Sequence, residues 1–196
     1  MELKRLEVGS FENNCYILIC PRTREAVIID PAAEAEKILR SIQRKSVKYI
    51  LMTHGHMDHI GALEEIQDLI HAPVGIHEQE ARALRRKPDF FLQDGQILTF
   101  GEVSLKALHT PGHSPGAVCF LSGKTLFSGD TIFPNGPGNT SIPRADFQEI
   151  LRSIHSKIFT LPDDTVVYPG HGLETTVGRE KLTSFYPLPN DLGRRS

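Results

Sequence analysis

A segment reading Thr-His-Gly-His-Met-Asp-His directly follows the strand-like apolar run Val47–Met52, and it constrains the fold more than any other stretch of the chain. Its imidazole and carboxylate groups are the ligand types that bind zinc and related divalent metals. The spacing gives two ligand groups on one turn, His54 with His56 and Asp58 with His59. We therefore expect a strand that ends at a metal site; the alternative is a solvated histidine-rich loop.

Three more residues of ligand type occur in the same setting further along the chain. Each lies shortly after an apolar strand-like run and directly follows a glycine, which lets the backbone turn sharply into a crowded site. They are His113, Asp130 and His171, preceded by Gly112, Gly129 and Gly170. Because strand ends can converge along one edge of a sandwich, all of these candidate ligands can share one place.

So many ligands exceed the needs of one tetrahedral zinc ion and suit two metals joined by a carboxylate. The first expected set is His54, His56 and His113, the second is Asp58, His59 and His171, and the bridge is Asp130. Two metals about 3.5–4 Å apart can share a hydroxide and lower the pKa of its parent water toward about 7. Asp58 and Asp130 are the expected catalytic carboxylates, and turn positions are the alternative role for both.

Two further polar residues lie near strand ends. Asp30 follows the run Ala26–Ile29, where it can either orient the second nitrogen of a ligating histidine or form a plain turn before Pro31. His109 lies within the strand that precedes His113, so it can contact a ligand at most, and not a metal.

The hydrophobic pattern predicts strands followed by helices, twice along the chain. Alternating or apolar runs predict strands at Leu3–Val8, Asn14–Cys20, Ala26–Ile29, Val47–Met52, Pro73–Ile76, Ile97–Phe100, Val103–Leu108, Ala117–Leu121, Thr125–Phe127 and Thr165–Tyr168. The first three of these strands, joined by short turns, favour an antiparallel meander.

Apolar residues at helical spacing predict helices through Ala35–Ile42 and Leu63–Ile70, and a short helix is expected over Glu78–Lys87. A further helix opens at Asp146, and its expected apolar face is Phe147, Ile150, Leu151, Ile154 and Ile158. Residues 89–96 are expected to be irregular, and residues 134–143 are expected to form a loop rich in proline, glycine and asparagine. Helices that cover one face of each of two sheets predict an α/β (α+β) fold, a four-layer αββα sandwich that residues 1–196 form as a single domain.

Composition excludes several classes of function. The formal net charge of -2 provides no field that would attract nucleic acid or an anionic membrane, and the apolar runs are too short to span a bilayer. Cys15, Cys20 and Cys119 lie among apolar strand residues, lack metal-ligand spacing and follow no signal peptide. We expect reduced, buried thiols in a cytoplasmic protein that acts on a small molecule.

The motifs together resemble those of the metallo-β-lactamase superfamily. The matching segments, in the family's order, are Thr53–His59 for its T-H-x-H-x-D-H motif, then Thr110–Ser114, Ser128–Asp130 and Tyr168–Gly172. Within the superfamily, Ser128–Phe133 and the compact length resemble the glyoxalase II-like hydrolases, the hydroxyacylglutathione hydrolases. The resemblance implies an αββα fold, a dinuclear zinc or iron site bridged by Asp130, and thioester hydrolysis.

The chain departs from the glyoxalase II pattern in two places. Only 25 residues follow His171, so we expect no C-terminal helical domain of the kind that helps that family to bind glutathione. Short bacterial and archaeal members often carry Gly-Arg-Thr-Asp in the loop before the helix that here opens at Asp146. This chain reads Gly-Asn-Thr-Ser from Gly138 in that loop. Arg144 can replace the missing arginine against a substrate carboxylate, with Asn139 as a second candidate contact; a surface arginine near a helix start is the alternative.

The resulting prediction is a metallo-hydrolase with two divalent metals, zinc first and iron or manganese as alternatives, acting on a thioester such as an acylglutathione. A thiolate, with a pKa near about 8.5, leaves without a dedicated protein acid. Three alternatives stay open. They are a persulfide dioxygenase with one iron on His54, on His113 or His56, and on Asp130; a lactonase or other small-ester hydrolase; and a non-catalytic metal-binding protein.

Overall fold

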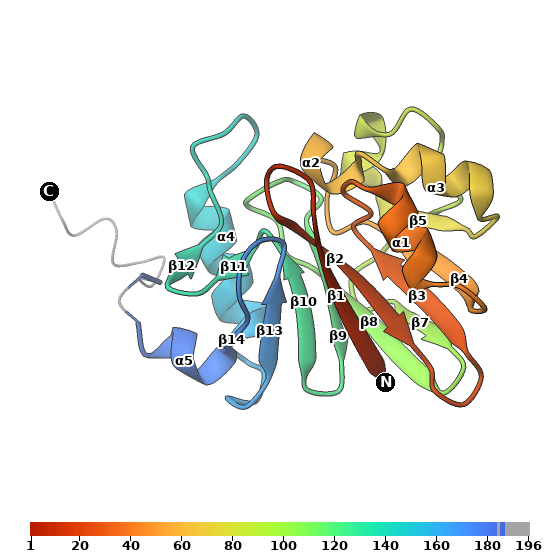
Figure 1. The fold of residues 1–196 in the computed structure, drawn as a ribbon. Coiled ribbons are helices and arrows are strands. Elements are labelled where there is room, and N and C mark those ends of the chain that lie inside the picture. Colours follow the sequence, from red (N-terminus) through yellow and green to blue (C-terminus); the bar gives the residue numbers. More distant parts are fainter. Residues whose placement is uncertain (184, 187–196) are drawn as a thin grey trace, which may run out of the picture.

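Two six-stranded sheets lie face to face in the computed structural model, which describes residues 1–183, 185 and 186 (Figure 1). In the first sheet the order is β1 (Glu2–Val8), β2 (Asn13–Ile19), β3 (Glu25–Ile29), β4 (Ser46–Leu51), β5 (Val74–His77) and β6 (Phe90–Leu92). In the second it is β14 (Thr175–Thr176), β13 (Val166–Pro169), β10 (Thr125–Gly129), β9 (Val118–Ser122), β8 (Val103–His109) and β7 (Ile97–Phe100). A separate hairpin joins β11 (Ile132–Phe133) and β12 (Gly136–Pro137).

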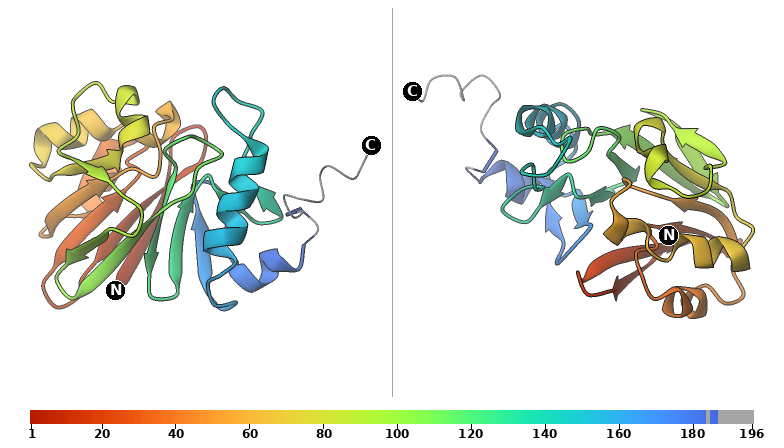
Figure 2. Two further views of the ribbon diagram at one scale, coloured as in Figure 1. Left: turned by 180° about the vertical axis from the view of Figure 1, so that it is seen from behind. Right: turned by 90° about the horizontal axis from the view of Figure 1, so that it is seen from above.

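Helices cover the outer side of each sheet. The α-helices are α1 (Ala35–Ser41), α2 (Met57–Ile60), α3 (Leu63–Leu69), α4 (Phe147–Ser153) and α5 (Val177–Lys181), with a 3₁₀ turn η1 (Glu78–Ala83) and a π-helical turn η2 (Ile154–Ile158). Helix α1 lies in front of the sheets in Figure 1, and α4 lies in front in the reversed view of Figure 2. Among the described residues, no helix has both the length and the apolar character that crossing a membrane requires.

Three apolar cores separate the four layers. One lies between the first sheet and helices α1 and α3, and it contains Ile28, Ile38 and Ile66. The second fills the space between the two sheets, and the third lies between the second sheet and helices α4 and α5, where Ile150 and Val177 pack. The predicted αββα sandwich is confirmed.

Strand β2 shows why the sequence reads as a continuous apolar run. Every residue of this strand is buried. Successive side chains of a strand point to opposite faces. Cys15 and Ile17 therefore belong to the core under the helices, while Tyr16 and Leu18 belong to the core between the sheets.

Strand direction brings several strand ends to one edge of the sandwich. The predicted meander is confirmed, because β1, β2 and β3 pair antiparallel, and β3, β4 and β5 then run parallel. In the second sheet β8 and β10 both pair antiparallel with β9, and β13 runs parallel to β10, so these three strands end at a common edge. The two edges meet where Val118 N–H donates to Thr53 O at 2.8 Å.

Two expectations about short segments were wrong because their pairing comes from distant residues. The segment 89–96 contains β6, which pairs parallel with β5, and three residues offer too few alternations to reveal a strand. The segment 134–143 contains Gly136–Pro137, which pairs back onto β11.

Two expectations about helices were also wrong. The helix expected over Glu78–Lys87 is a 3₁₀ turn that ends at Ala83. Phe147 was placed on the apolar face of the helix after Asp146, but its side chain is 40% exposed. Phe147 occupies the first turn, ahead of the buried pair Ile150 and Leu151.

Candidate metal centre

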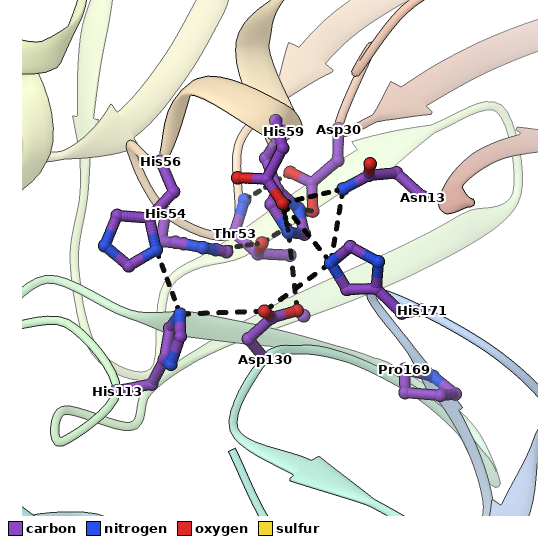
Figure 3. Close-up of polar contacts among 12 residues, drawn as sticks. Asn13, Asp30, Thr53, His54, His56, His59, His113, Asp130, Pro169 and His171 are labelled. Carbon is purple, nitrogen blue, oxygen red and sulfur yellow. Dashed lines mark hydrogen bonds and ion pairs between the residues drawn. The ribbon is translucent and has the colours of Figure 1, made fainter. Parts of the chain in front are cut away.

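Loops at the ends of four strands carry the predicted ligands into one place (Figure 3). The segment from His54 to His59 follows β4 and includes the short helix α2. His113 lies between β8 and β9, Asp130 follows β10, and His171 follows β13. These loops meet at the common edge of the two sheets, as the strand directions require.

The ligand-type atoms fall into three overlapping groups. Within each group, one atom from every member lies within 4.8 Å of the others: His54, His56 and His113; His54, His59 and Asp130; Asp58, His59 and His171. The first and third groups have the same members as the two sets expected from the sequence. Asp130 joins the middle group, which shares His54 with the first and His59 with the third.

Backbone carbonyls orient His113 and His171. Asn139 O lies 2.8 Å from Nδ1 of His113, and Phe11 O lies 2.8 Å from Nδ1 of His171. A carbonyl oxygen can only accept, so Nδ1 carries the proton in each ring and Nε2 of the neutral ring keeps its lone pair. In both residues Nε2 faces Asp130, at 3.6 Å from Oδ2 for His113 and 3.7 Å for His171.

Asp30 and Thr53 orient the other two buried histidines (Figure 3). Asp30 accepts hydrogen bonds from Thr53 N–H at 2.7 Å, from the Thr53 hydroxyl at 2.6 Å and from Nδ1 of His59 at 3.0 Å. Because the Thr53 proton goes to Asp30, its oxygen is free to accept from Nδ1 of His54 at 3.0 Å. The prediction that Asp30 orients a histidine is confirmed, and the plain-turn alternative is wrong.

Three buried atoms at the centre make no well-formed hydrogen bond among the described residues: Nε2 of His54, Nε2 of His59 and Oδ1 of Asp130. The last two lie 3.4 Å apart, as an ion-pair contact. An unsatisfied buried polar group costs about 1–3 kcal/mol. A cluster of such poorly satisfied atoms in one place is typical of a site that binds a ligand. Imidazole nitrogen and carboxylate oxygen suit zinc and similar divalent ions, so the residues present fit such metals.

The electrostatics of the site keep two key groups in their metal-binding forms. Burial and four neighbouring imidazoles hold the pKa of His54 well below its usual range, which favours the neutral ring. Burial raises the pKa of Asp130, but a hydrogen bond from His59 and the positive charge that His59, His113 and His171 carry when protonated lower it by more, which favours the ionised carboxylate. Metals bind neutral imidazole and ionised carboxylate, since protons compete for the same lone pairs.

Asn13 belongs to the site, and sequence reasoning missed it. Its side-chain amide donates to Oδ2 of Asp58 at 3.2 Å and lies 3.3 Å from Nε2 of His171. The residue is 2% exposed. A polar residue directly before the apolar run of β2 was the only available signal, and the contacts themselves join positions far apart in the chain.

Three other predicted residues lie outside the ligand cluster. His109 contacts no candidate ligand: its Nε2 lies 2.9 Å from Pro115 O. Asn139 is exposed, its side chain accepts from Ser141 N–H at 2.9 Å, and its carbonyl holds His113. Arg144 is exposed, and its guanidinium donates to Gln79 O at 3.3 Å.

The fold and the site together define an αββα protein with a metal-ligand cluster at converging strand ends. A family model described as the metallo-β-lactamase superfamily matches residues 8–171, and the chain belongs to that superfamily. Members of this superfamily are generally metallo-hydrolases.

The relatives that match nearly the whole chain include two whose names state an activity. Hydroxyacylglutathione hydrolase GloC from Haemophilus influenzae is 33% identical over 94% of this chain and 97% of its own length. A protein named probable metallo-hydrolase YqgX from Bacillus subtilis is 36% identical over 92% of this chain and 95% of its own length.

Solved structures with the same fold include three that are at least 28% identical to this chain. BLEG-1, described as a B3 metallo-β-lactamase, has a TM-score of 0.86 at 35% identity and covers 91% of this chain and 96% of its own. ETHE1 from Myxococcus xanthus has a TM-score of 0.83 at 28% identity, with coverage of 95% and 84%. TTHA1623, solved in a di-iron-bound form, has a TM-score of 0.79 at 34% identity, with coverage of 92% and 98%.

Proposed function

We propose that this protein is a dinuclear metallo-hydrolase that cleaves a thioester of the hydroxyacylglutathione type. The observation that carries the proposal is the position of Asp130. One oxygen, Oδ2, lies 3.6 Å from Nε2 of His113 in the first ligand group and 3.7 Å from Nε2 of His171 in the third. A carboxylate placed evenly between two groups of ligands is suited to bridge two metals.

The ligands in this proposal are His54, His56 and His113 for one metal, Asp58, His59 and His171 for the other, and Asp130 for both. When bound, two divalent metals lower the pKa of a shared water toward about 7 and polarise the attacked carbonyl. Hydrogen bonds fix the orientation of three of these ligands. The Nδ1 atoms of His59, His171 and His113 contact Asp30, Phe11 O and Asn139 O, respectively. Asn13 donates to Asp58 and keeps that carboxylate turned toward His171.

A thioester is the proposed substrate for a chemical reason and a comparative one. The departing thiolate has a pKa near about 8.5, so its expulsion needs no protein acid. The relative named hydroxyacylglutathione hydrolase GloC supports the glutathione part of the proposal.

Arg144 is the proposed contact for a substrate carboxylate. The residue is exposed, and a hollow beside it is lined by Gln79, Arg82, Phe91 and Pro115. Pro115 is two residues from His113, in the loop that carries this ligand of the first group. In this proposal the side chain of Asn139 contacts substrate next to Arg144, in addition to the contact of its carbonyl with His113.

The first experiment is a count of metals per chain by elemental mass spectrometry, on protein purified without added metal or chelator. We expect about two metals, zinc first, followed by hydrolysis of S-lactoylglutathione. A lactone and a β-lactam belong in the same assay panel, since one similar structure is described as a β-lactamase. Two bound metals with turnover of the lactone alone would contradict the thioester and keep the hydrolase.

The persulfide dioxygenase is the second candidate, and metal content separates it from the hydrolase. It needs one iron held by His54, by either His113 or His56, and by Asp130. In that case Asp58, His59 and His171 would bind no second metal. That group is complete in the structure, which supports the dinuclear proposal. One iron per chain with little zinc, and oxygen uptake with glutathione persulfide, would move the dioxygenase to first place.

A further inference from the structure

Glu80, on the turn η1, is a buried carboxylate that contacts two loops of the site. The residue is 5% exposed. Its Oε2 accepts a hydrogen bond from Gly55 N–H at 3.3 Å, and its Oε1 accepts one from Gly116 N–H at 2.7 Å. Burying a carboxyl group costs free energy unless hydrogen bonds offset the cost, and these two contacts supply such bonds.

Both of these loops carry ligands of the first group. Gly55 lies between His54 and His56, and Gly116 is three residues beyond His113. The facing nitrogens, Nδ1 of His56 and Nε2 of His113, are 3.0 Å apart. Glu80 therefore joins the two segments whose separation sets this distance.

The two glycines leave room for the carboxylate. A Cβ on Gly55 would come within 2.7 Å of Ala83 Cβ and 3.0 Å of Oε2 of Glu80. A Cβ on Gly116 would come within 2.7 Å of Cγ of Glu80. Neither position could carry a side chain without pushing its loop away from η1, so the close approach of both loops depends on these residues.

The peptide between Pro115 and Gly116 is held at both of its polar atoms. Its N–H donates to Glu80, while its carbonyl oxygen lies 2.9 Å from Nε2 of His109. The His109 ring stacks on His77 with 4.2 Å between ring centroids and 6° between ring planes. A peptide group held on both sides cannot rotate freely, so the loop that carries His113 has a defined orientation.

We propose that Glu80 is a positioning residue that sets His56 against His113 and so tunes the first metal position, the one formed by His54, His56 and His113. The inference rests on the proposed metal centre. Residues that orient metal ligands typically change metal affinity by about 10–100-fold when they are removed. The effect of Glu80 falls on the first position, because Gly55 lies directly between His54 and His56 of that group. Asp58 and His59 follow on the separate short helix α2, and His171 lies beyond β13.

The test compares Glu80→Gln and Glu80→Asp with Glu78→Gln. Glutamine places an NH₂ group against one of the two N–H donors, and aspartate is too short to reach both loops. Glu78 is exposed on the same turn, so its variant removes the same charge without either contact. Zinc affinities are measured by competition with a chromophoric chelator, and His56→Ala identifies which of the two binding phases belongs to the first position.

We expect both Glu80 variants to weaken the first phase by about 10–100-fold and to leave the second phase and the Glu78→Gln protein unchanged. Equal weakening of both phases, or of neither, would overturn the inference. Urea unfolding of the metal-free proteins accompanies the titration, since a purely structural role would lower stability without discriminating between the phases. If the unmodified protein itself binds fewer than two zinc ions, the proposed dinuclear centre is wrong. If it binds two zinc ions and the Glu80 variants bind them equally well, only the role proposed for Glu80 is wrong.

Discussion

Oδ2 of Asp30 lies 3.0 Å from Nδ1 of His59, although the two residues are 29 positions apart in the chain. Asp30 is 2% exposed and His59 is fully buried. The same carboxylate accepts both hydrogen bonds of Thr53, which in turn contacts His54. One buried side chain thus orients a histidine of each proposed metal position.

The Asp30→Asn variant tests this relationship. Asparagine tolerates the left-handed backbone at this position, where φ is 50°, but it has one acceptor in place of two. We expect the metal-free protein to lose about 1.5–3 kcal/mol, the usual worth of a hydrogen bond to a charged group, and zinc to bind about 10–100-fold more weakly. Urea unfolding and zinc competition measure the two effects. Unchanged zinc binding would show that the histidines hold their orientation without Asp30.

Removal of Asp130 tests the proposed bridge. The Asp130→Ala variant should lose metal and turnover together, because the carboxylate oxygens lie within 3.4–3.7 Å of His59, His113 and His171. The matched control is Asp164→Ala, an exposed aspartate paired with Lys124. Metal content by elemental mass spectrometry and the initial rate with S-lactoylglutathione are measured for both. Activity near that of the unmodified protein in Asp130→Ala would contradict the dinuclear model.

Gly170 tests how tightly the ligands are packed. A Cβ at this position would lie 2.1 Å from Oδ1 of Asp130 and 2.7 Å from Cε1 of His59. Gly170→Ala should therefore displace the carboxylate, reduce zinc binding and destabilise the fold by about 1–3 kcal/mol, as overpacking usually does. Gly136→Ala is the control, since a Cβ there meets nothing within 4 Å. Equal zinc content in the two variants would show that the site yields to the added methyl group.

Arg144→Ala tests the proposed contact with an anionic substrate. We expect KM for S-lactoylglutathione to rise about tenfold, equivalent to about 1.4 kcal/mol, with little change in kcat, because a contact remote from the reacting bond contributes equally to ground and transition states. Arg40, an exposed arginine paired with Glu36 on α1, provides the control variant. An unchanged KM would show that Arg144 does not contact the substrate.

Two cysteines should stay unreactive while the protein is folded. Burial raises the pKa of Cys119 to about 11, and burial together with the charge of Asp30 raises that of Cys15 as well. Both thiols are fully buried and remain protonated at about pH 8, and the thiol form is a poor nucleophile. Iodoacetamide should therefore label them in urea and not in buffer, as read by mass spectrometry of peptides. Labelling of either residue in the folded protein would contradict the assigned burial.

The prediction of strands and helices succeeded where the hydrophobic pattern extended over enough residues. Period-two alternation and helical spacing located the core strands and helices α1, α3 and α4 within a few residues. The prediction failed at β6 and at η1, because a three-residue strand and a 3₁₀ turn depend on neighbours supplied by the rest of the fold.

The sequence by itself determined which side chains gather at the centre. The candidate ligands lie in the segments that follow four strands, and strands of the same direction end at the same edge, so the local pattern was sufficient to predict that His54, Asp130 and His171 come together. Tertiary structure alone decided how they are held. Phe11 O and Asn139 O are backbone atoms that no motif reveals, and Asn13 and Glu80 reach the site from distant elements. The residue types in the sequence identify the candidate ligands, whereas the orientation of these ligands depends on contacts that exist only once the chain has folded.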